Sequence, residues 1–199
     1  MEAMVEIGGL PLRWRSEPPP SSRSGHQRLE ISAAGGTDLF VDPMGATPAL
    51  GAPRATGRPA GDFMLRALVT VELAATYDAG ALVLYAHERA WAKLCLELSP
   101  RGAPTVVSVV TREVSDDCNS FAVDGRQTWL RVSRLGPAFA FHASADGRAW
   151  SLVRYFALEP AAEMEVGFLA QSPTGAGCAA RFDQIAYVPE RLADLRGGV

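Results

Sequence analysis

Residues 91–97, which read Trp-Ala-Lys-Leu-Cys-Leu-Glu, alternate in character with a period of two. In an extended strand, successive side chains point to opposite faces of the sheet. The alanine and leucine side chains of this segment therefore share one face, which suits a hydrophobic core. The opposite face carries Trp91, Lys93, Cys95 and Glu97. The pattern predicts a central strand that presents an aromatic ring, a cation and a carboxylate on one side, as a binding groove requires.

Strand-like segments recur along the rest of the chain, and turn signals such as Asp124-Gly125 and Asp146-Gly147 separate them. Many short strands joined by tight turns are typical of a sandwich or a barrel, and this many favour a jelly roll. The predicted strands are 28–32, 38–41, 62–75, 81–86, 91–99, 105–112, 128–135, 138–144, 151–156, 164–170 and 180–188.

Two segments do not read as strands. Residues 15–25 contain Pro19 and Pro20, which lack amide donors, and we expect a loop there. Residues 188–195 carry the one helix-like pattern and predict a short terminal helix. The length of 199 residues suits one domain over 1–199, with its core at about 10–188.

Composition excludes several classes of function. The net charge is −3 and the basic residues are scattered, so we expect no nucleic-acid partner. The apolar runs are too short to span a bilayer and the first residues lack a targeting pattern, so we expect a soluble, cytoplasmic protein without a membrane partner. The three widely spaced cysteines, Cys95, Cys118 and Cys178, indicate a reduced compartment and apolar filler roles.

Charged residues occur inside the predicted strands as well as at loop tips. One interpretation is a concave sheet face on which a sugar stacks against a ring and bonds to charged groups. The other is a set of cross-strand ion pairs on a solvated sheet; Trp91 favours the groove. The charged residues inside the predicted strands are Lys93, Glu97, Arg112, Arg131 and Arg154.

The candidate ligand-binding set follows from the groove interpretation. Trp91 would supply stacking. Lys93, Arg112 and Arg154 would donate hydrogen bonds, and Glu97 and Asp116 would accept them. Asp116 also has a second interpretation, because Ser-Asp after a strand is typical of a turn cap.

Evidence for catalysis or for a metal is weak. The Glu-x-Asp-x-x-Glu string of sandwich glycosidases does not occur, so no catalytic residue is assigned. His26, His87 and His142 have no ligand spacing and suggest surface or groove positions, so we expect neither a metal nor a cofactor. Asp38, Asp62 and Asp78 stand at strand ends, where capping of turns is the default role.

Residues 144–150, Ser-Ala-Asp-Gly-Arg-Ala-Trp, resemble the Asp-box hairpins of sialidases. In such hairpins the aspartate bonds turn amides, the glycine takes a positive φ, and the tryptophan packs on the next strand. We expect a purely structural role for this hairpin.

A series of motifs occurs in a fixed order along the chain. The motifs are Trp14 with Pro18-Pro19, 37–40 (TDLF), 61–63 (GDF), 77–80 (YDAG), 91–97 (WAKLCLE), 108–112 (SVVTR) with Ser115-Asp116, 129–132 (WLRV), 144–147 (SADG) with Trp150 and Arg154, and Val166-Gly167 with Ser172-Pro173. This ordered series resembles a family of unknown function related to the fungal regulation-of-enolase protein, and the resemblance covers about residues 10–187. It implies a concanavalin A-like jelly roll of two curved antiparallel sheets with a concave groove, and no established reaction.

The chain departs from the family pattern at two places. Cys95 and Leu96 precede Glu97 where the family usually has glycine or alanine, and Asp117 follows Asp116 where an aromatic residue is common. These differences predict a narrower and more acidic groove.

Taken together, the sequence predicts a non-catalytic module that binds a carbohydrate or a related polar small molecule. Two alternatives remain open. One is a glycan-acting hydrolase or lyase centred on Glu97, and the other is a regulatory domain that binds another protein.

Overall fold

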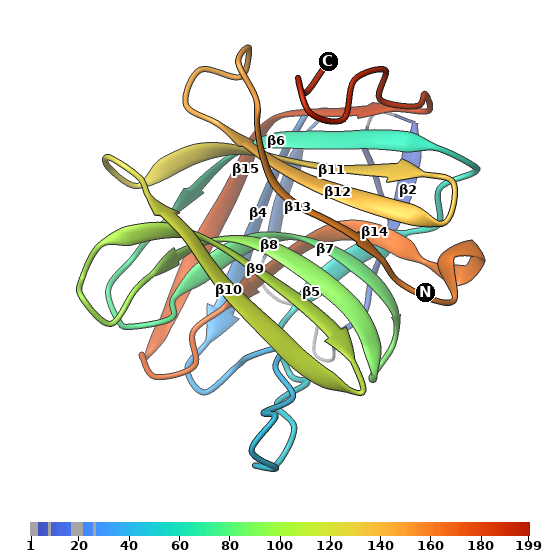
Figure 1. The fold of residues 1–199 in the computed structure, drawn as a ribbon. Coiled ribbons are helices and arrows are strands. Elements are labelled where there is room, and N and C mark those ends of the chain that lie inside the picture. The colour runs from blue at the N-terminus through green and yellow to red at the C-terminus, as the bar shows by residue number, and fades with distance from the viewer. Residues whose placement is uncertain (1–3, 8, 17–21, 26) are drawn as a thin grey trace.

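The computed structural model describes residues 4–7, 9–16, 22–25 and 27–199. Within these residues the chain forms two antiparallel sheets that pack face to face as a β-sandwich (Figure 1). The eight-stranded sheet has the order β1-β2-β5-β14-β7-β8-β9-β10. Its strands are β1 (Met4–Ile7), β2 (Leu10–Trp14), β5 (Arg54–Gly57), β7 (Ala79–His87), β8 (Ala90–Leu98), β9 (Pro104–Arg112), β10 (Val114–Ala122) and β14 (Glu165–Gln171).

The seven-stranded sheet has the order β13-β12-β11-β6-β15-β4-β3. A single turn of 3-10 helix, η1 (Ala161–Glu163), precedes β14, and none of the described helices is long and apolar enough to cross a membrane. The strands of this sheet are β3 (Ser22–Gly25), β4 (Arg28–Ala34), β6 (Phe63–Val71), β11 (Gln127–Leu135), β12 (Ala138–Ser144), β13 (Ser151–Ala157) and β15 (Gly177–Val188).

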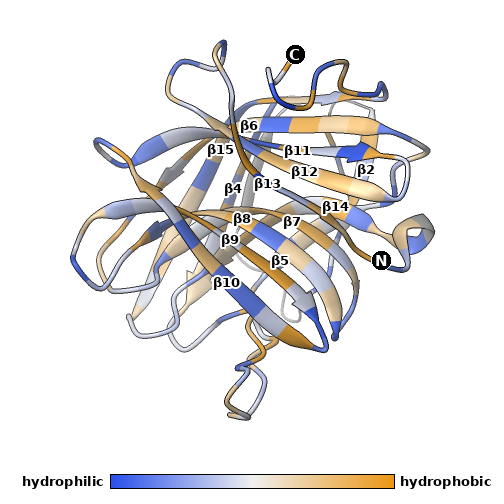
Figure 2. Cartoon of the chain, in the orientation of Figure 1, coloured by the Kyte–Doolittle hydropathy of each residue, from blue (hydrophilic) through white to orange (hydrophobic). Residues whose placement is uncertain are grey.

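The core lies between the two sheets and follows the period-two patterns of the sequence. In β8, Ala92, Leu94 and Leu96 point into it, and in β11 Leu130 and Val132 do the same. Hydrophobic residues run along the strands of both sheets, whereas hydrophilic residues occupy much of the edge strand β10 (Figure 2). Polar side chains on an exposed edge discourage pairing with other chains. The predicted all-β sandwich is confirmed.

Most of the predicted strands are present, with ends that differ by a few residues. The prediction at 38–41 is wrong, because Phe40 forms only an isolated bridge with Ala49. Strands β1, β2, β5 and β10 were not predicted, and β10 contains Asp116, for which a turn cap was one interpretation. Of the loop predicted over 15–25, residues 17–21 lie outside the described residues, whereas 22–25 form β3.

The C-terminal segment, residues 189–199, is not the predicted helix; it lies over the outer face of the seven-stranded sheet (Figure 1). Leu192 packs with Leu135 and Ala140 of β11 and β12. Arg131 Nη2 donates to the carbonyl of Gly198 at 2.8 Å. An eight-residue helix is marginal by itself, so these tertiary contacts decide the conformation. Arg131 therefore lies on the outer face of the seven-stranded sheet, which is the face away from β8.

A second covering segment, which we call the strap (residues 37–52), crosses the outer face of the eight-stranded sheet. It starts at a bridge between Thr37 and Ser172. Farther along, the amide of Val41 donates to Ser115 Oγ at 2.9 Å, and the amide of Ser115 donates back to the carbonyl of Val41 at 2.8 Å. Leu39 and Val41 pack in a hydrophobic cluster on this outer face. The strap therefore encloses part of a surface that an open sheet would expose.

The Asp-box-like hairpin has the structural role expected of it. Asp146 Oδ1 accepts hydrogen bonds from the amides of Arg148 and Ala149 at 2.8 and 2.9 Å. Gly147 has φ of +72°, and a Cβ there would lie 2.7 Å from the ring of Trp129. Glycine is thus required both for the backbone conformation and for close packing.

We predict that Gly147→Ala destabilises the fold more than a matched glycine substitution. Gly125 also has a positive φ, +82°, but a Cβ there meets no atom within 4 Å. Gly125→Ala should therefore cost only the left-handed strain of about 1–2 kcal/mol, whereas Gly147→Ala adds about 1–3 kcal/mol of overpacking. Urea unfolding of both variants measures the difference, and equal losses would contradict the proposed packing of Gly147 under Trp129.

Candidate functional site

The register of the eight-stranded sheet brings a set of polar side chains together on its outer face. Lys93 in β8 is opposite Val109 in β9, and Val109 is opposite Asp117 in β10. Two pleats along, Glu97 is opposite Ala79 in β7, and Ala79 is opposite Gln171 at the end of β14. Because paired residues share a face, these polar side chains project on one side of the five adjacent strands β14, β7, β8, β9 and β10.

Lys93 is the organising residue of this face, with only 2% of its surface exposed. Its Nζ donates to Gln171 Oε1 at 2.7 Å and lies 3.3 Å from Asp38 Oδ1 on the strap. It also lies 5.8 Å from the centre of the Trp91 ring. A buried ammonium needs such partners, since an unpaired one is costly. The ion pair joins the strap to the middle of the sheet.

A sharp turn before β7 presents a further aromatic side chain at this site. The buried carboxylate of Asp78 accepts from the amides of Ala74 and Ala75 at 3.1 and 2.8 Å, as expected of a capping aspartate. This turn holds Tyr77 at φ of +70° with a partly exposed side chain. Gln171 Nε2 donates to the carbonyl of Tyr77 at 3.2 Å. Gln171 therefore connects the turn to Lys93.

These groups line one cavity of about 250 Å³. The strap contributes Asp38 and Phe40 to its wall, and the sheet and the turn contribute the rest. The lining residues are Asp38, Phe40, Tyr77, Lys93, Glu97, Val109, Asp117 and Gln171.

Burial and crowding of carboxylates shift the proton affinities in the cavity. Burial raises the pKa of Glu97 to about 7, with Lys93 opposing the shift and Asp117 and Asp38 adding to it. Burial also raises the pKa of Asp117, again against the opposing charge of Lys93. For Lys93, burial alone lowers the pKa, but the charges of Asp38 and Glu97 help to outweigh it, so its pKa is raised. Lys93 therefore stays charged at neutral pH, whereas Glu97 titrates there.

Of the six residues predicted to bind a ligand, Lys93 and Glu97 line this cavity. Trp91 does not: its ring is completely buried in the cluster under the strap, and its Nε1 donates to the carbonyl of Glu88 at 3.2 Å. The predicted stacking role is corrected accordingly, because packing with residues such as Val41 covers the ring. Trp91 shares the face of Lys93, as the alternation indicates, but it serves as packing.

Arg112, Asp116 and Arg154 lie elsewhere, at the open edge of the sandwich. Arg112 Nε and Nη2 donate to the carbonyl of Ala157 at the end of β13, at 3.2 and 2.8 Å. Arg154 Nη2 in β13 lies 2.9 Å from Asp116 Oδ2 in β10. Asp116 is opposite Val110, whose side chain belongs to the core, so it leaves β10 on the face away from Asp117. These three residues join the edges of the two sheets and do not converge with Lys93.

Six cavity residues were not in the predicted set. Asp38 was interpreted as a turn cap; its Oδ1 does accept from the amide of Leu39, at 2.7 Å, and the same atom pairs with Lys93. Asp117 did carry a signal, as a departure from the family pattern next to Asp116. Nothing in the alternation of β8 could identify partners on other segments. The missed residues are Asp38, Phe40, Tyr77, Val109, Asp117 and Gln171.

The other titratable candidates contribute nothing to the cavity. His142 is buried under the C-terminal segment, which corrects its expected surface or groove position, and its Nε2 donates to the carbonyl of Leu195 at 2.9 Å. His87 is exposed, and His26 lies outside the described residues. Cys118 is exposed, in contrast to the buried Cys95 and Cys178. Among the described residues, no group of three or more histidines, cysteines, aspartates and glutamates is arranged to hold a metal ion.

The cavity can therefore hold a small polar molecule and exchange a proton with it. Its carboxylates accept hydrogen bonds from hydroxyl or amino groups, and Lys93 donates them. Phe40 and Tyr77 supply apolar surface. A carboxyl group with a pKa of about 7 is also suited to general acid–base chemistry.

Solved structures with a similar fold were found, whereas no curated protein sequence matches the chain. A protein of Saccharomyces cerevisiae described as functionally unknown is 21% identical, with a TM-score of 0.80 over 88% of this chain and 94% of that one. A mutant of the GH43 protein BlXynB from Bacillus licheniformis is 15% identical, with a TM-score of 0.70 over 89% of this chain and 36% of that one. The xylan beta-1,4-xylosidase of Bacillus halodurans C-125 is 12% identical, with a TM-score of 0.65 over 87% and 40%.

At these identities the likeness establishes the fold alone, and the chain spans at most two fifths of the length of these two bacterial proteins. The description of the yeast protein assigns it no function, so the relation to enolase regulation stays a prediction. A family model described as "Protein of unknown function (DUF1349)" matches residues 14–190. This match covers the strands from β3 to β15 and every residue of the cavity under the strap, and the chain therefore belongs to that family.

Proposed function

We propose that the protein binds a carbohydrate or a related small polyhydroxyl compound in the cavity under the strap. The observation that carries the proposal is the meeting of Lys93, Glu97 and Asp117 with two aromatic side chains in a single cavity. Sugars combine apolar C–H faces with dense hydroxyl groups, so they require this mixture of surfaces.

Each group has a place in such a complex. Asp117 and the ionised form of Glu97 accept hydrogen bonds from ligand hydroxyls, and Lys93 donates to a ligand oxygen. Phe40 and Tyr77 take over the stacking role that the sequence had assigned to Trp91. At about 250 Å³, the cavity is below the roughly 300–1,000 Å³ of sites for drug-sized ligands, so it suits a single sugar residue.

A second candidate function, hydrolysis or lysis of a glycan, is favoured by one observation. Glu97, with a pKa of about 7, shares the cavity with a second carboxyl group, that of Asp117. A protonated carboxyl beside an ionised one is the arrangement that acid–base cleavage of glycosides uses. Release of new reducing ends from an oligosaccharide panel, lost in Glu97→Gln, would favour this candidate over simple binding.

We predict that removing the carboxylate of Asp117 or that of Glu97 weakens sugar binding strongly. Xylose and xylo-oligosaccharides are the first probes, since one structural neighbour is named as a xylan beta-1,4-xylosidase, followed by a wider panel of monosaccharides. Isothermal titration calorimetry should give at least a tenfold weaker affinity for Asp117→Asn and Glu97→Gln, because each loses a charged acceptor worth about 1.5–3 kcal/mol.

Asp116→Asn is the matched control for this experiment. It makes the same chemical change one residue away, at the sheet edge where Asp116 pairs with Arg154, and binding should be unaffected. Equal losses in the Asp116 and Asp117 variants, or no binding by any member of the panel, would argue against the cavity as the site.

We predict that affinity for a neutral sugar rises with pH around neutrality. Glu97 accepts a hydroxyl hydrogen bond best when ionised, and its pKa is about 7. The ionised fraction therefore increases about tenfold between pH 6 and pH 8, and the apparent affinity should follow it. Calorimetric titrations at these two pH values measure the change, and Glu97→Gln should remove it.

We predict that the free energy of unfolding, unlike the affinity for a sugar, falls as pH rises. The pKa of Glu97 is about 7 in the folded protein and 4.5 as the reference value. Between these values the folded state binds more protons, so the free energy of unfolding falls as pH rises through this window, by up to about 3 kcal/mol. If the free energy of unfolding of the wild type rose from pH 5 to pH 8, Glu97 would not be a buried acid. The same would follow if Glu97→Gln left the dependence of this free energy on pH unchanged.

A further inference from the structure

The cavity under the strap carries more negative than positive charge. Its charged lining residues are one lysine and three acidic residues, and Lys93 Nζ lies 3.3 Å from Asp38 Oδ1. These two charges compensate each other. Among the described residues, Glu97 and Asp117 form no ion pair at salt-bridge distance. With Asp117 ionised, the cavity therefore has a net charge of −1 while Glu97 is protonated and of −2 once Glu97 ionises.

Glu97 is a nearly buried carboxyl group that faces this cavity. Only 9% of the residue is exposed, and its side chain accepts no hydrogen bond from any residue that the structure describes. Buried polar groups are normally hydrogen-bonded, so a carboxyl without a partner in a cavity wall is suited to bonding with a ligand. Burial and the charges of Asp117 and Asp38 raise the pKa of Glu97 to about 7, against the opposing charge of Lys93. A second cation beside Glu97 would oppose that shift.

Two arginines near this part of the molecule are engaged elsewhere. Arg154, whose charge acts on Asp117, pairs with Asp116 Oδ2 at 2.9 Å. Arg54, which is buried on the same outer face of the sheet, lies 4.3 Å from the centre of the Tyr85 ring. Neither arginine lines the cavity under the strap.

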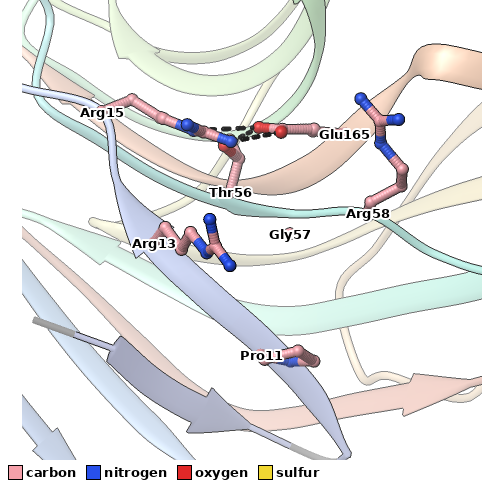
Figure 3. Close-up of a pocket in the computed structure, with 7 residues that line it drawn as sticks. All are labelled: Pro11, Arg13, Arg15, Thr56, Gly57, Arg58 and Glu165. Atoms are coloured by element: carbon pink, nitrogen blue, oxygen red, sulfur yellow. Dashed lines mark hydrogen bonds and ion pairs between the residues drawn. The ribbon is translucent and has the colours of Figure 1, made fainter. Parts of the chain in front are cut away.

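Further arginines gather on the same outer face over β2, β5 and β14, where they line a second cavity of about 360 Å³ (Figure 3). Figure 3 shows Glu165 held there by Arg15, whose Nε donates to Oε2 at 3.1 Å. The two cavities share no lining residue. The outer face thus separates basic from acidic side chains, and a compensating positive charge in the cavity under the strap is left to the ligand.

We propose that the ligand of the cavity under the strap is an amino sugar, whose protonated amino group lies beside Glu97 and Asp117. This inference rests on the proposed function and narrows the class of sugar. An ammonium group donates three hydrogen bonds and neutralises the excess negative charge, which a hydroxyl group cannot do. The rings of Phe40 and Tyr77 also favour a cation, because the face of an aromatic ring attracts positive charge.

Calorimetric titration with matched pairs of sugars tests the charge of the ligand. The pairs are glucose with glucosamine, galactose with galactosamine, and mannose with mannosamine, at pH 6, where the amino group is protonated. We expect an amino sugar to bind at least about tenfold more tightly than its neutral partner, because charge-assisted hydrogen bonds are about twice as strong as neutral ones. N-acetylglucosamine, which has the nitrogen without the charge, should lack this advantage.

The outcomes separate this inference from the proposed function. If glucose, galactose or mannose binds as tightly as its amino partner, the inference is overturned and the proposed function stands. If no sugar and no amino sugar binds, both fail.

Two variants identify the groups that hold the ammonium. Asp117→Asn should reduce the preference for the amino sugar over its neutral partner several-fold. Asp124→Asn makes the same chemical change in the exposed turn between β10 and β11 and should keep the preference. An equal preference in the two variants would contradict the proposal.

Release of a proton provides a second readout. At pH 6 most Glu97 is protonated, so an ammonium bound beside it should ionise it and release roughly half a proton or more per ligand. Calorimetry in two buffers of different ionisation enthalpy measures this release. No release from the wild type, or equal release from Glu97→Gln, would show that the amino group does not lie beside Glu97.

Discussion

The ion pair between Lys93 and Asp38 is the interaction on which the outer face of the eight-stranded sheet depends. It places a positive charge in the middle of a central strand, with almost no exposure to water. A buried charge of this kind persists only if neighbouring groups compensate it, and losing one partner of such a pair typically costs about 3–5 kcal/mol. The strap supplies that compensation and is itself held over the sheet by it.

The cavity follows from this arrangement. Asp38 and Phe40 form one wall because the strap passes above Lys93, and Asp117 and Glu97 form the other sides because the register aligns them with Lys93. Hydrophobic packing under the strap, around Trp91, fills the neighbouring space. The same covering that creates the cavity also dries it, and this raises the pKa of Glu97. The shape of the cavity and the raised pKa of Glu97 thus have one common cause, which is the covering of the sheet by the strap.

Local patterns in the sequence were sufficient for the fold and for part of the site. The alternation in 91–97 correctly places Lys93 and Glu97 on the face away from the core, because side-chain direction in a strand depends only on parity. The same rule placed Trp91 there too, but parity does not reveal that a distant segment covers the ring.

The remaining site residues depend on non-local contacts. Arg112, Asp116 and Arg154 were grouped with Lys93 because all are polar residues within or next to strands. Contacts across the open edge of the sandwich decide their role. No pattern within a single strand predicts such contacts. The prediction of a C-terminal helix is wrong for the same reason, because Leu192 of this segment packs on a sheet that precedes it in the chain.

Amide hydrogen exchange in Lys93→Met tests this account most directly. The amide of Val41 donates to Ser115 of β10, and the amides of Phe40 and Ala52 donate to the carbonyls of Ala49 and Asp38 within the folded strap. The amides of Val69 and Phe182 lie in the paired strands β6 and β15 of the other sheet. We predict that the strap amides lose protection selectively, while the sheet amides keep protection that reflects global unfolding. Strap amides that remain as protected as in the wild type would contradict the claim that the buried ion pair holds the strap and shapes the cavity.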